Sequence, residues 1–243
     1  MKILGIIPAR YGSSRFPGKP LIDLKGKSMI QRVYEGAMRA DLLSDVIVAT
    51  DDERIVAVVE GFGGKVMLTD SAHPSGTDRC GEIAKQFPDI DVVINIQGDE
   101  PLVDYRQLNT LAGAFVDPEV QIATLGIRDV SVEDILNPNR IKIVVNQHNE
   151  ALYFSRSAIP NSANASGDPL EIYPFLRHIG LYAYRAQTLQ ELVQLAPTAL
   201  EKIESLEQLR WLYYGYKIQV VHTDIETPNI DVPADVEKVL RFL

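Results

Sequence analysis

Apolar runs alternate with amphipathic stretches along the first half of the chain, and each such pair predicts a strand followed by a helix. The predicted pairs are residues 3–7 and 29–40, 46–49 and 53–61, and 92–96 and 105–115. This order indicates βαβ units, which build parallel sheets. The strands show little alternation of apolar and polar positions, as strands covered on both faces do. We predict a three-layer α/β/α sandwich with a mainly parallel, Rossmann-like sheet.

The second half of the chain has a less regular pattern. Two short apolar runs flank the turn at residues 146–150 and predict a small β hairpin that extends the sheet. Residues 161–169 are rich in turn formers and predict a loop. The remaining predicted elements are hairpin strands at 141–145 and 151–154, strands at 179–184 and 218–221, and helices at 187–195, 206–213 and from 234. All of them fit one domain covering residues 1–243.

A glycine-rich loop with three cations follows the first predicted strand. Arg10, Arg15 and Lys19 lie among glycines, serines and prolines at residues 8–21. Glycine permits close approach of the backbone to an anion, while hydroxyl, N–H and cationic groups bind its oxygens. The loop therefore predicts a phosphate site, although a plain connection with scattered cations would have a similar composition.

Two common phosphate motifs do not fit this loop. Five residues separate Gly12 from Gly18, where a Walker loop has four, and Pro20 stands where that loop has a magnesium-binding hydroxyl. The same two glycines lack the spacing of a dinucleotide-binding fingerprint. The loop is therefore neither a Walker nor a Rossmann phosphate motif.

Carboxylates end two apolar segments that we expect near the cationic loop. Asp99 follows Gly98 at the end of a predicted strand, and Asp231 precedes Pro233. Magnesium binds one or two carboxylates together with substrate phosphates, so Asp99 is the natural first metal ligand. Each aspartate could instead cap the helix that follows it.

A third polar segment, Ser75 to Arg79, follows a turn and begins a helical stretch. Its hydroxyls and free N–H groups would gather at a helix N-terminus, which favours anions. Thr77 and Asp78 would equally make an ordinary N-cap.

Charge and cysteine content limit the classes of function. The 243 residues contain 24 Lys+Arg and 33 Asp+Glu, a formal charge of -9, which argues against a general nucleic-acid or anionic-membrane binder. Cys80 is the one cysteine, so no intrachain disulfide can form. We expect no signal peptide in the short apolar run at 3–7, no membrane span, and a cytoplasmic location.

These motifs, in this order, resemble the nucleotidylyltransferases that activate acidic sugars with CTP. The Arg-x-Pro-Gly-Lys-Pro-Leu form at residues 15–21 resembles the 3-deoxy-manno-octulosonate (Kdo) cytidylyltransferases, and the likeness runs along nearly the whole chain. It implies transfer of CMP from CTP to the anomeric hydroxyl of Kdo, giving CMP-Kdo and pyrophosphate for lipopolysaccharide biosynthesis. It also implies Mg²⁺ and a homodimer. An amino-modified Kdo or another acidic sugar, such as a sialic acid, stays open as the acceptor. A catalytically inactive nucleotide-binding regulator on the same fold is a second alternative for the whole protein.

The resemblance also assigns roles to individual residues. It implies a nucleotide side mainly within 1–130 and a sugar and dimer side mainly within 131–215. Alternatives for the sugar side are a packed core histidine at 178 and a solvated helix face carrying Glu201, Glu204 and Glu207. The implied catalytic residues are Arg10, Lys19, Asp99 and Asp231, with Asp99 and Asp231 as metal ligands; nucleotide-binding residues are Pro8, Ala9, Arg10, Ser13, Arg15, Lys19, Ser75, Gly76, Arg79 and Gln97; substrate-binding residues are Arg156, His178, Tyr182, Glu207 and Gln208.

Overall fold

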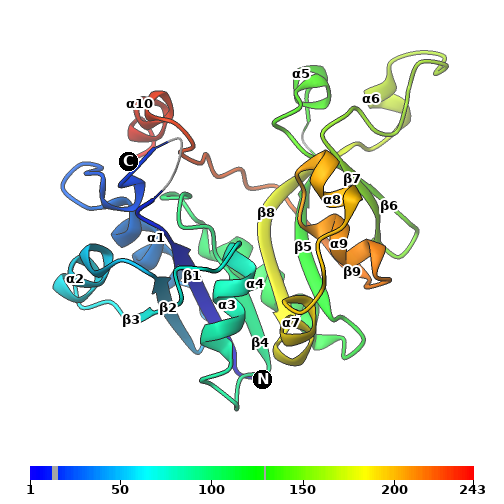
Figure 1. The fold of residues 1–243 in the computed structure, drawn as a ribbon. Helices are drawn as coiled ribbons and strands as arrows, with labels where there is room; N and C mark the ends of the chain where they lie inside the picture. The colour runs from blue at the N-terminus through cyan, green and yellow to red at the C-terminus, as the bar shows by residue number, and fades with distance from the viewer. Residues whose placement is uncertain (13–15, 129) are drawn as a thin grey trace.

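One nine-stranded sheet runs through the computed structural model, which describes residues 1–12, 16–128 and 130–243 (Figure 1). Seven strands follow the order β3-β2-β1-β4-β8-β5-β9, while β6 and β7 extend the sheet beside β8. The strands are β1 Ile3–Ala9, β2 Asp45–Thr50, β3 Val66–Leu68, β4 Val92–Asn95, β5 Ile122–Ile127, β6 Lys142–Val145, β7 Ala151–Ser155, β8 Leu176–Arg185 and β9 Ile218–Thr223.

The sheet is mainly parallel, as predicted. β1 pairs in parallel with β2 and β4, β2 with β3, and β5 with β9. β8 is antiparallel to both β4 and β5. The carboxyl ends of the parallel strands therefore share one edge with the amino end of β8. In open α/β sheets this edge is where ligands bind.

Helices cover both faces of the sheet and complete the predicted three layers. Apolar side chains of α1, α2 and α4 pack on one face, and those of α3, α7 and α9 pack on the other. Side-chain oxygens of Ser28, Asp52, Ser75 and Asp104 accept N–H groups at the first turns of α1 to α4, which fixes where these helices begin. The helices are α1 Met29–Ala37, α2 Glu53–Gly61, α3 Gly76–Ala84, α4 Tyr105–Gly113, α5 Val132–Leu136, α6 Pro169–Ile172, α7 Ala186–Leu192, α8 Ala199–Glu204, α9 Gln208–Tyr213 and α10 Val236–Leu240.

The C-terminal segment crosses back to the first half of the molecule, where α10 lies near α1 (Figure 1). Ile230 and Val239 are buried against Leu24 and Met29 in a small separate cluster. This packing carries the segment before α10, with Asp231, to the loop after β1.

The structure confirms the hairpin, because β6 and β7 pair antiparallel. Strands β3 and β5 were missed. β5 is buried along its whole length, and its apolar run includes Gly126, which weakens the strand pattern. None of the helices in the described residues is long and apolar enough to cross a membrane.

Candidate active site

The loop after β1 presents Lys19 at the sheet edge. Gly18 adopts φ +72°, a left-handed conformation that suits glycine, and its N–H donates to the carbonyl oxygen of Tyr11 at 2.9 Å. The short 3₁₀ helix η1, Lys19–Leu21, begins at this turn, and its middle residue, Pro20, is buried. Pro8 and Ala9 form the end of β1. The predicted nucleotide-binding residues Ser13 and Arg15 lie outside the described residues.

Lys19 joins the two predicted metal ligands. Its Nζ donates to Asp99 Oδ2 at 2.8 Å and to the Ile230 carbonyl oxygen at 2.8 Å, and lies 4.0 Å from Asp231 Oδ1. The Ile230 N–H donates to the Asp99 carbonyl oxygen at 3.0 Å. Asp99 and Ile230, more than a hundred positions apart in the chain, thereby both accept hydrogen bonds from the Lys19 ammonium.

Neither aspartate caps a helix. The N-cap of α4 is Asp104, whose carboxylate accepts the Arg106 N–H. Ahead of the 3₁₀ helix η3, Pro233–Asp235, the carboxylate of Asp235 accepts the N–H groups of Asp231 and Val232 at 3.1 Å each. The capping alternatives are therefore wrong for both Asp99 and Asp231.

The carboxylate pair fits magnesium. Asp99 and Asp231 both approach the single positive charge of Lys19, so their oxygens already converge on a cation. No group of three or more potential metal-ligating side chains occurs within the described ranges. Two carboxylates suffice for magnesium, because substrate phosphates and water complete its six ligands.

Gly98 allows the strand that carries Asp99 to pass close to β1. A Cβ added at Gly98 would lie 2.7 Å from the Pro8 carbonyl oxygen, closer than any ordinary contact. The Pro8 oxygen and the Gly98 Cα both belong to the backbone, so a rotamer change cannot relieve this contact.

We expect Gly98→Ala to lower the free energy of unfolding by about 1–3 kcal/mol, because the added methyl group overpacks this contact. Urea unfolding measures the change. Gly113→Ala is the matched control, since nothing lies within 4 Å of a Cβ added there and Gly113 is helical. The control should be neutral or stabilising by up to about 1 kcal/mol. Equal stability of both variants would contradict the close contact.

The N-terminus of α3 lies against the end of β1. A Cβ at Gly76 would lie 3.1 Å from Pro8 Cγ, and an Arg10 NH2 donates to the His73 carbonyl oxygen at 2.7 Å. Ser75, rather than Thr77 or Asp78, is the N-cap, and it accepts the Asp78 N–H. Pro8, Arg10, Ser75 and Gly76 therefore lie close together, and their role in binding the nucleotide stays a prediction.

Glu201, Glu204 and Glu207 accept hydrogen bonds from other side chains, so the prediction that they form a solvated helix face is wrong. Glu207 accepts the Thr77 hydroxyl at 2.8 Å and lies 2.9 Å from Ser75 Oγ. Glu204 accepts the Ser155 hydroxyl, and Glu201 accepts two N–H groups of Arg210. Burial raises the pKa of Glu207, and the two hydroxyls partly offset that rise. Glu207 thus ties α9 to the N-terminus of α3, with Gln208 buried beside it.

Arg79 lies inside the protein. Its side chain is fully buried, and its guanidinium donates to Thr69 Oγ1 and, at 3.2 Å, to Asp51 Oδ2. Asp51 follows β2, and Thr69 follows β3. In this position Arg79 holds two loops together at the sheet edge. A nucleotide-binding role for it stays a prediction.

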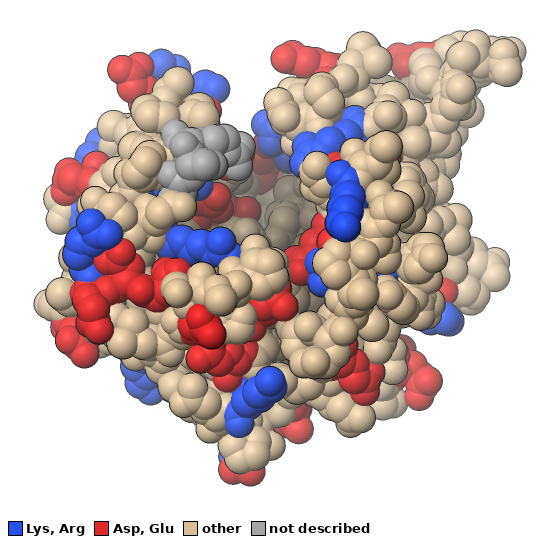
Figure 2. All heavy atoms as spheres, viewed as in Figure 1, with Lys and Arg blue, Asp and Glu red and all other residues tan. Residues whose placement is uncertain are grey.

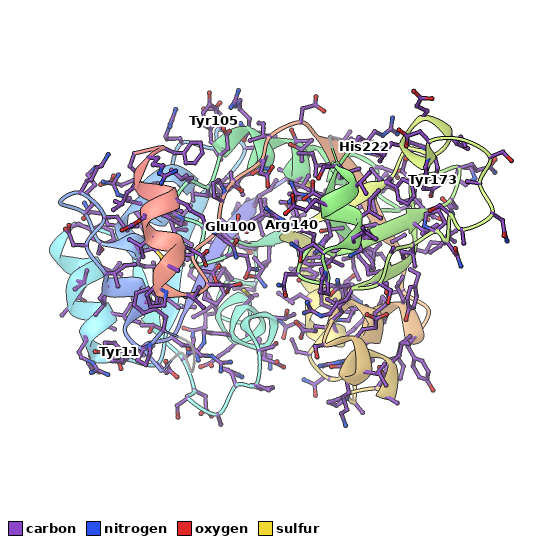
Figure 3. All side chains as sticks on the ribbon, turned by 90° about the horizontal axis from the view of Figure 1, so that it is seen from above. Tyr11, Glu100, Tyr105, Arg140, Tyr173 and His222 are labelled. Atoms are coloured by element: carbon purple, nitrogen blue, oxygen red, sulfur yellow. The ribbon has the colours of Figure 1, made fainter. Side chains whose placement is uncertain are left out.

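A cavity of about 290 Å³ opens between the two halves of the molecule. Figure 2 shows the surface hollowed there, with charged side chains of both signs on the walls. Glu100 and Arg140 lie on opposite sides of this space in Figure 3. Burial, with a smaller effect of the neighbouring Asp99, raises the pKa of Glu100 to about 8. The lining residues are Gln97, Asp99, Glu100, Asn139, Arg140, Ile141, Arg177, His178, Ile179, Gly180, Thr227 and Asn229.

His178 and Tyr182 belong to an aromatic cluster on β8. The His178 ring packs edge-on against Phe154 and at an angle to Tyr182, and its Nε2 lies 2.9 Å from Thr124 Oγ1. Burial first, and then the nearby Arg177, lower the pKa of His178 to about 3, so the ring is neutral at neutral pH. His178 therefore is both a packed histidine and a wall of the cavity.

Arg156 does not line the cavity. Its Nε donates to the Glu204 carbonyl oxygen at 2.7 Å, and its other nitrogens donate to those of Pro138 and Ser205 at 3.1 and 3.3 Å. Its donors thus bind backbone at the end of α8 and at Pro138, between α5 and β6. A sugar-binding role for Arg156 is not tested by this arrangement and stays a prediction.

Several lining residues were missed from the sequence. Arg140, Arg177, Glu100 and Thr227 come from four separate segments, and only the fold brings them together. A signal did exist for Glu100 and Arg177, since each is a charged residue next to a predicted site residue and within or beside an apolar run.

Known proteins with similar sequences and structures cover the whole chain. The family model described as Cytidylyltransferase matches residues 4–218. The chain is 53% identical over 249 residues to the 3-deoxy-manno-octulosonate cytidylyltransferase of Parabacteroides distasonis, covering 100% of this chain and 98% of that relative. The Bacteroides thetaiotaomicron protein of the same name is 52% identical with the same coverage. A solved CMP:2-keto-3-deoxy-manno-octonic acid synthetase complexed with CTP matches with a TM-score of 0.93 and 45% identity, covering 100% of this chain and 98% of its own.

Proposed function

Because the chain belongs to the cytidylyltransferase family, we propose that it transfers CMP from CTP to the anomeric hydroxyl of Kdo, releasing pyrophosphate. The observation that carries the proposal is Lys19 between Asp99 and Asp231, beside a cavity of about 290 Å³ with polar walls. The hydroxyl oxygen attacks the α-phosphorus, its proton passes to water, and the bond to pyrophosphate breaks. This chemistry asks for alignment and charge neutralisation rather than a side-chain nucleophile.

The triphosphate lies along the loop after β1 in this proposal. Lys19 supplies charge, and Arg10 with Arg15 adds to it. The N-terminus of α3 at Ser75 and Gly76 lies against the same end of β1 and favours an anion, and Gln97 lines the cavity. Pro8, Ala9 and Ser13 complete the contacts that the resemblance implies.

Asp99 and Asp231 would hold Mg²⁺. When bound, the ion would neutralise charge at the α-phosphate and lower the pKa of the acceptor hydroxyl. The Lys19 ammonium would then bind both the aspartates and the substrate, because it lies near the two carboxylates and can rotate to donate to phosphate oxygens when CTP binds.

The acceptor occupies the cavity in front of β8. The neutral His178 ring and the protonated Glu100 carboxyl offer hydrogen bonds to sugar hydroxyls without adding charge. Tyr182 lies on the same strand, and its ring packs at an angle to the His178 ring. Glu207 and Gln208 extend this polar surface along α9.

We expect purified enzyme with Mg²⁺, CTP and Kdo to release pyrophosphate, with far less release for ATP or GTP. A coupled phosphate assay across CTP, ATP, GTP and UTP measures the preference. A second panel of Kdo, amino-Kdo and sialic acid identifies the acceptor. Equal turnover with all nucleotides would contradict the cytidine assignment, and greater turnover with amino-Kdo would replace the acceptor.

A homodimer in the cytoplasm, acting in lipopolysaccharide biosynthesis, completes the proposal. Exposed apolar side chains on the second half, including Leu152 on β7 and Tyr213 on the contacting α9, support a partner surface there. The lone cysteine, Cys80, is buried and free, which agrees with a reducing compartment.

A further inference from the structure

Two arginines that line the cavity, from different segments, converge on one carboxylate. Arg177 NH2 lies 2.9 Å from Glu226 Oε1, and Arg140 NH1 lies 3.3 Å from the same oxygen. Resting on the proposed function, we propose that Arg177 and Arg140 form the site for the carboxylate of the acid acceptor, and that Glu226 is an internal competitor for it.

Arg177 has the properties of a built anion site. Its side chain is only 5% exposed, and its buried Nε has no hydrogen-bond partner within the described part of the chain. A guanidinium presents two parallel N–H donors to a carboxylate, and Glu226 uses one edge of this fork. The guanidinium thus has a buried donor without an acceptor among the described residues, and the residue lines the cavity.

Arg140 is held in place from behind. The buried Lys142 Nζ donates to the Arg140 carbonyl oxygen at 2.6 Å, and Asp134 Oδ1 lies 3.6 Å from Arg140 Nε. The backbone position is thus fixed, while the guanidinium reaches the cavity. Both arginines line it together with Gln97 and Asp99.

Glu226 is the partner that can be exchanged. Its side chain is 47% exposed, and it lies between β9 and η3, outside any helix or strand. With Glu226 displaced, Arg140 would keep Asp134 as a carboxylate neighbour at 3.6 Å. A substrate carboxylate restores the balance of charge, so exchange of one carboxylate for another has a small net electrostatic effect.

The position of this pair suits the chemistry. In a 2-keto sugar acid the carboxylate is bonded directly to the anomeric carbon. Anchoring that carboxylate on Arg177 and Arg140 therefore places the anomeric hydroxyl within the same cavity, which Asp99 also lines. Arg156, with its donors on three backbone carbonyls, is less available for this contact.

Kinetics with Kdo and Kdo methyl ester test the pair, because the ester lacks the negative charge. We expect R177Q to raise the KM for Kdo by about 30-fold or more, with the KM for the ester and for CTP nearly unchanged. R140Q should act in the same direction and carries little folding risk, because the Arg140 side chain is 41% exposed. A merely structural arginine would weaken acid and ester alike.

We expect E226Q to change the KM for Kdo in the opposite direction from R177Q and R140Q. Removal of the competing charge should lower the KM for Kdo about two- to fivefold, the range of exposed ion pairs, and should enlarge the rise in melting temperature that Kdo causes. R185Q is the matched control: Arg185 ends the same strand and donates to the carbonyl oxygens of Val120 and Phe115. It should leave the preference for acid over ester unchanged.

The outcomes separate the two proposals. Absence of pyrophosphate release from wild-type enzyme with Kdo would refute the proposed function. An active wild type, with R140Q and R177Q that keep its preference for the acid, would overturn the arginine site. Weaker Kdo binding by E226Q would refute the competition.

Discussion

Asp99→Asn should leave the fold intact and lower turnover by about a thousandfold or more. The substitution keeps the size of the side chain and removes the charge that meets Lys19 and that would recruit magnesium. Loss of such a contact in the transition state costs about 4 kcal/mol, which corresponds to that factor in rate. Single-turnover pyrophosphate release at saturating CTP and Kdo measures the effect.

Asp104→Asn is the matched control for Asp99→Asn. Asp104 lies five residues further on and caps α4, and asparagine caps helices about as well as aspartate. Turnover in this control should stay within about twofold of wild type, since the change affects a helix cap that is paired with Arg106 and does not line the cavity. Near wild-type activity of folded Asp99→Asn would remove Asp99 from the metal site.

The first half of the fold could be predicted because its signals are local. The apolar runs of β1, β2 and β4 are each continuous in the sequence, the helices α1, α2 and α4 have apolar positions at helical spacing, and residues 53–61 form a helix as predicted. Asp99 could be predicted as a site residue for the same reason, since the end of a buried strand marks the ligand edge.

The partners of these residues could not be predicted from spacing. Lys19 donates to the Ile230 carbonyl oxygen across 211 positions of the chain, through packing of α10 that no local pattern shows. Glu207 would be a solvated helix residue in an isolated α9. It becomes an acceptor for Ser75 and Thr77 because β8 and β4 place α9 beside α3.

Charged residues inside apolar runs were the signal that sequence reasoning used least. Arg79 lies within a helix whose other buried residues are small or apolar, and Arg177 lies within β8. A buried charge requires a partner or a ligand. Arg79 has Asp51 and Thr69 as partners, and Arg177 pairs with Glu226 within the described part of the chain. Both arginines also have a buried Nε without a partner among the described residues, so the place of Arg177 in the cavity lining is what separates a candidate ligand site from an internal brace.

The second large effect is expected for Lys19→Met, which keeps much of the side-chain volume and removes the ammonium between Asp99 and Asp231. We expect turnover to fall about 100- to 1000-fold, as on loss of one preorganised electrostatic contact, with a raised KM for CTP and little change in the KM for Kdo. Initial rates at varied CTP and varied Kdo distinguish the two parameters.

Lys65→Met tests whether loss of any lysine–aspartate pair produces this defect. Lys65 Nζ lies 2.5 Å from Asp45 Oδ2, but the lysine side chain is 62% exposed and lies away from the cavity lining. Exposed pairs contribute only about 0–1 kcal/mol, so this control should retain wild-type kinetics. A Lys19→Met enzyme with less than about a tenfold loss in kcat/KM for CTP would place the triphosphate elsewhere, because a cation in contact with the transferred group contributes more than that.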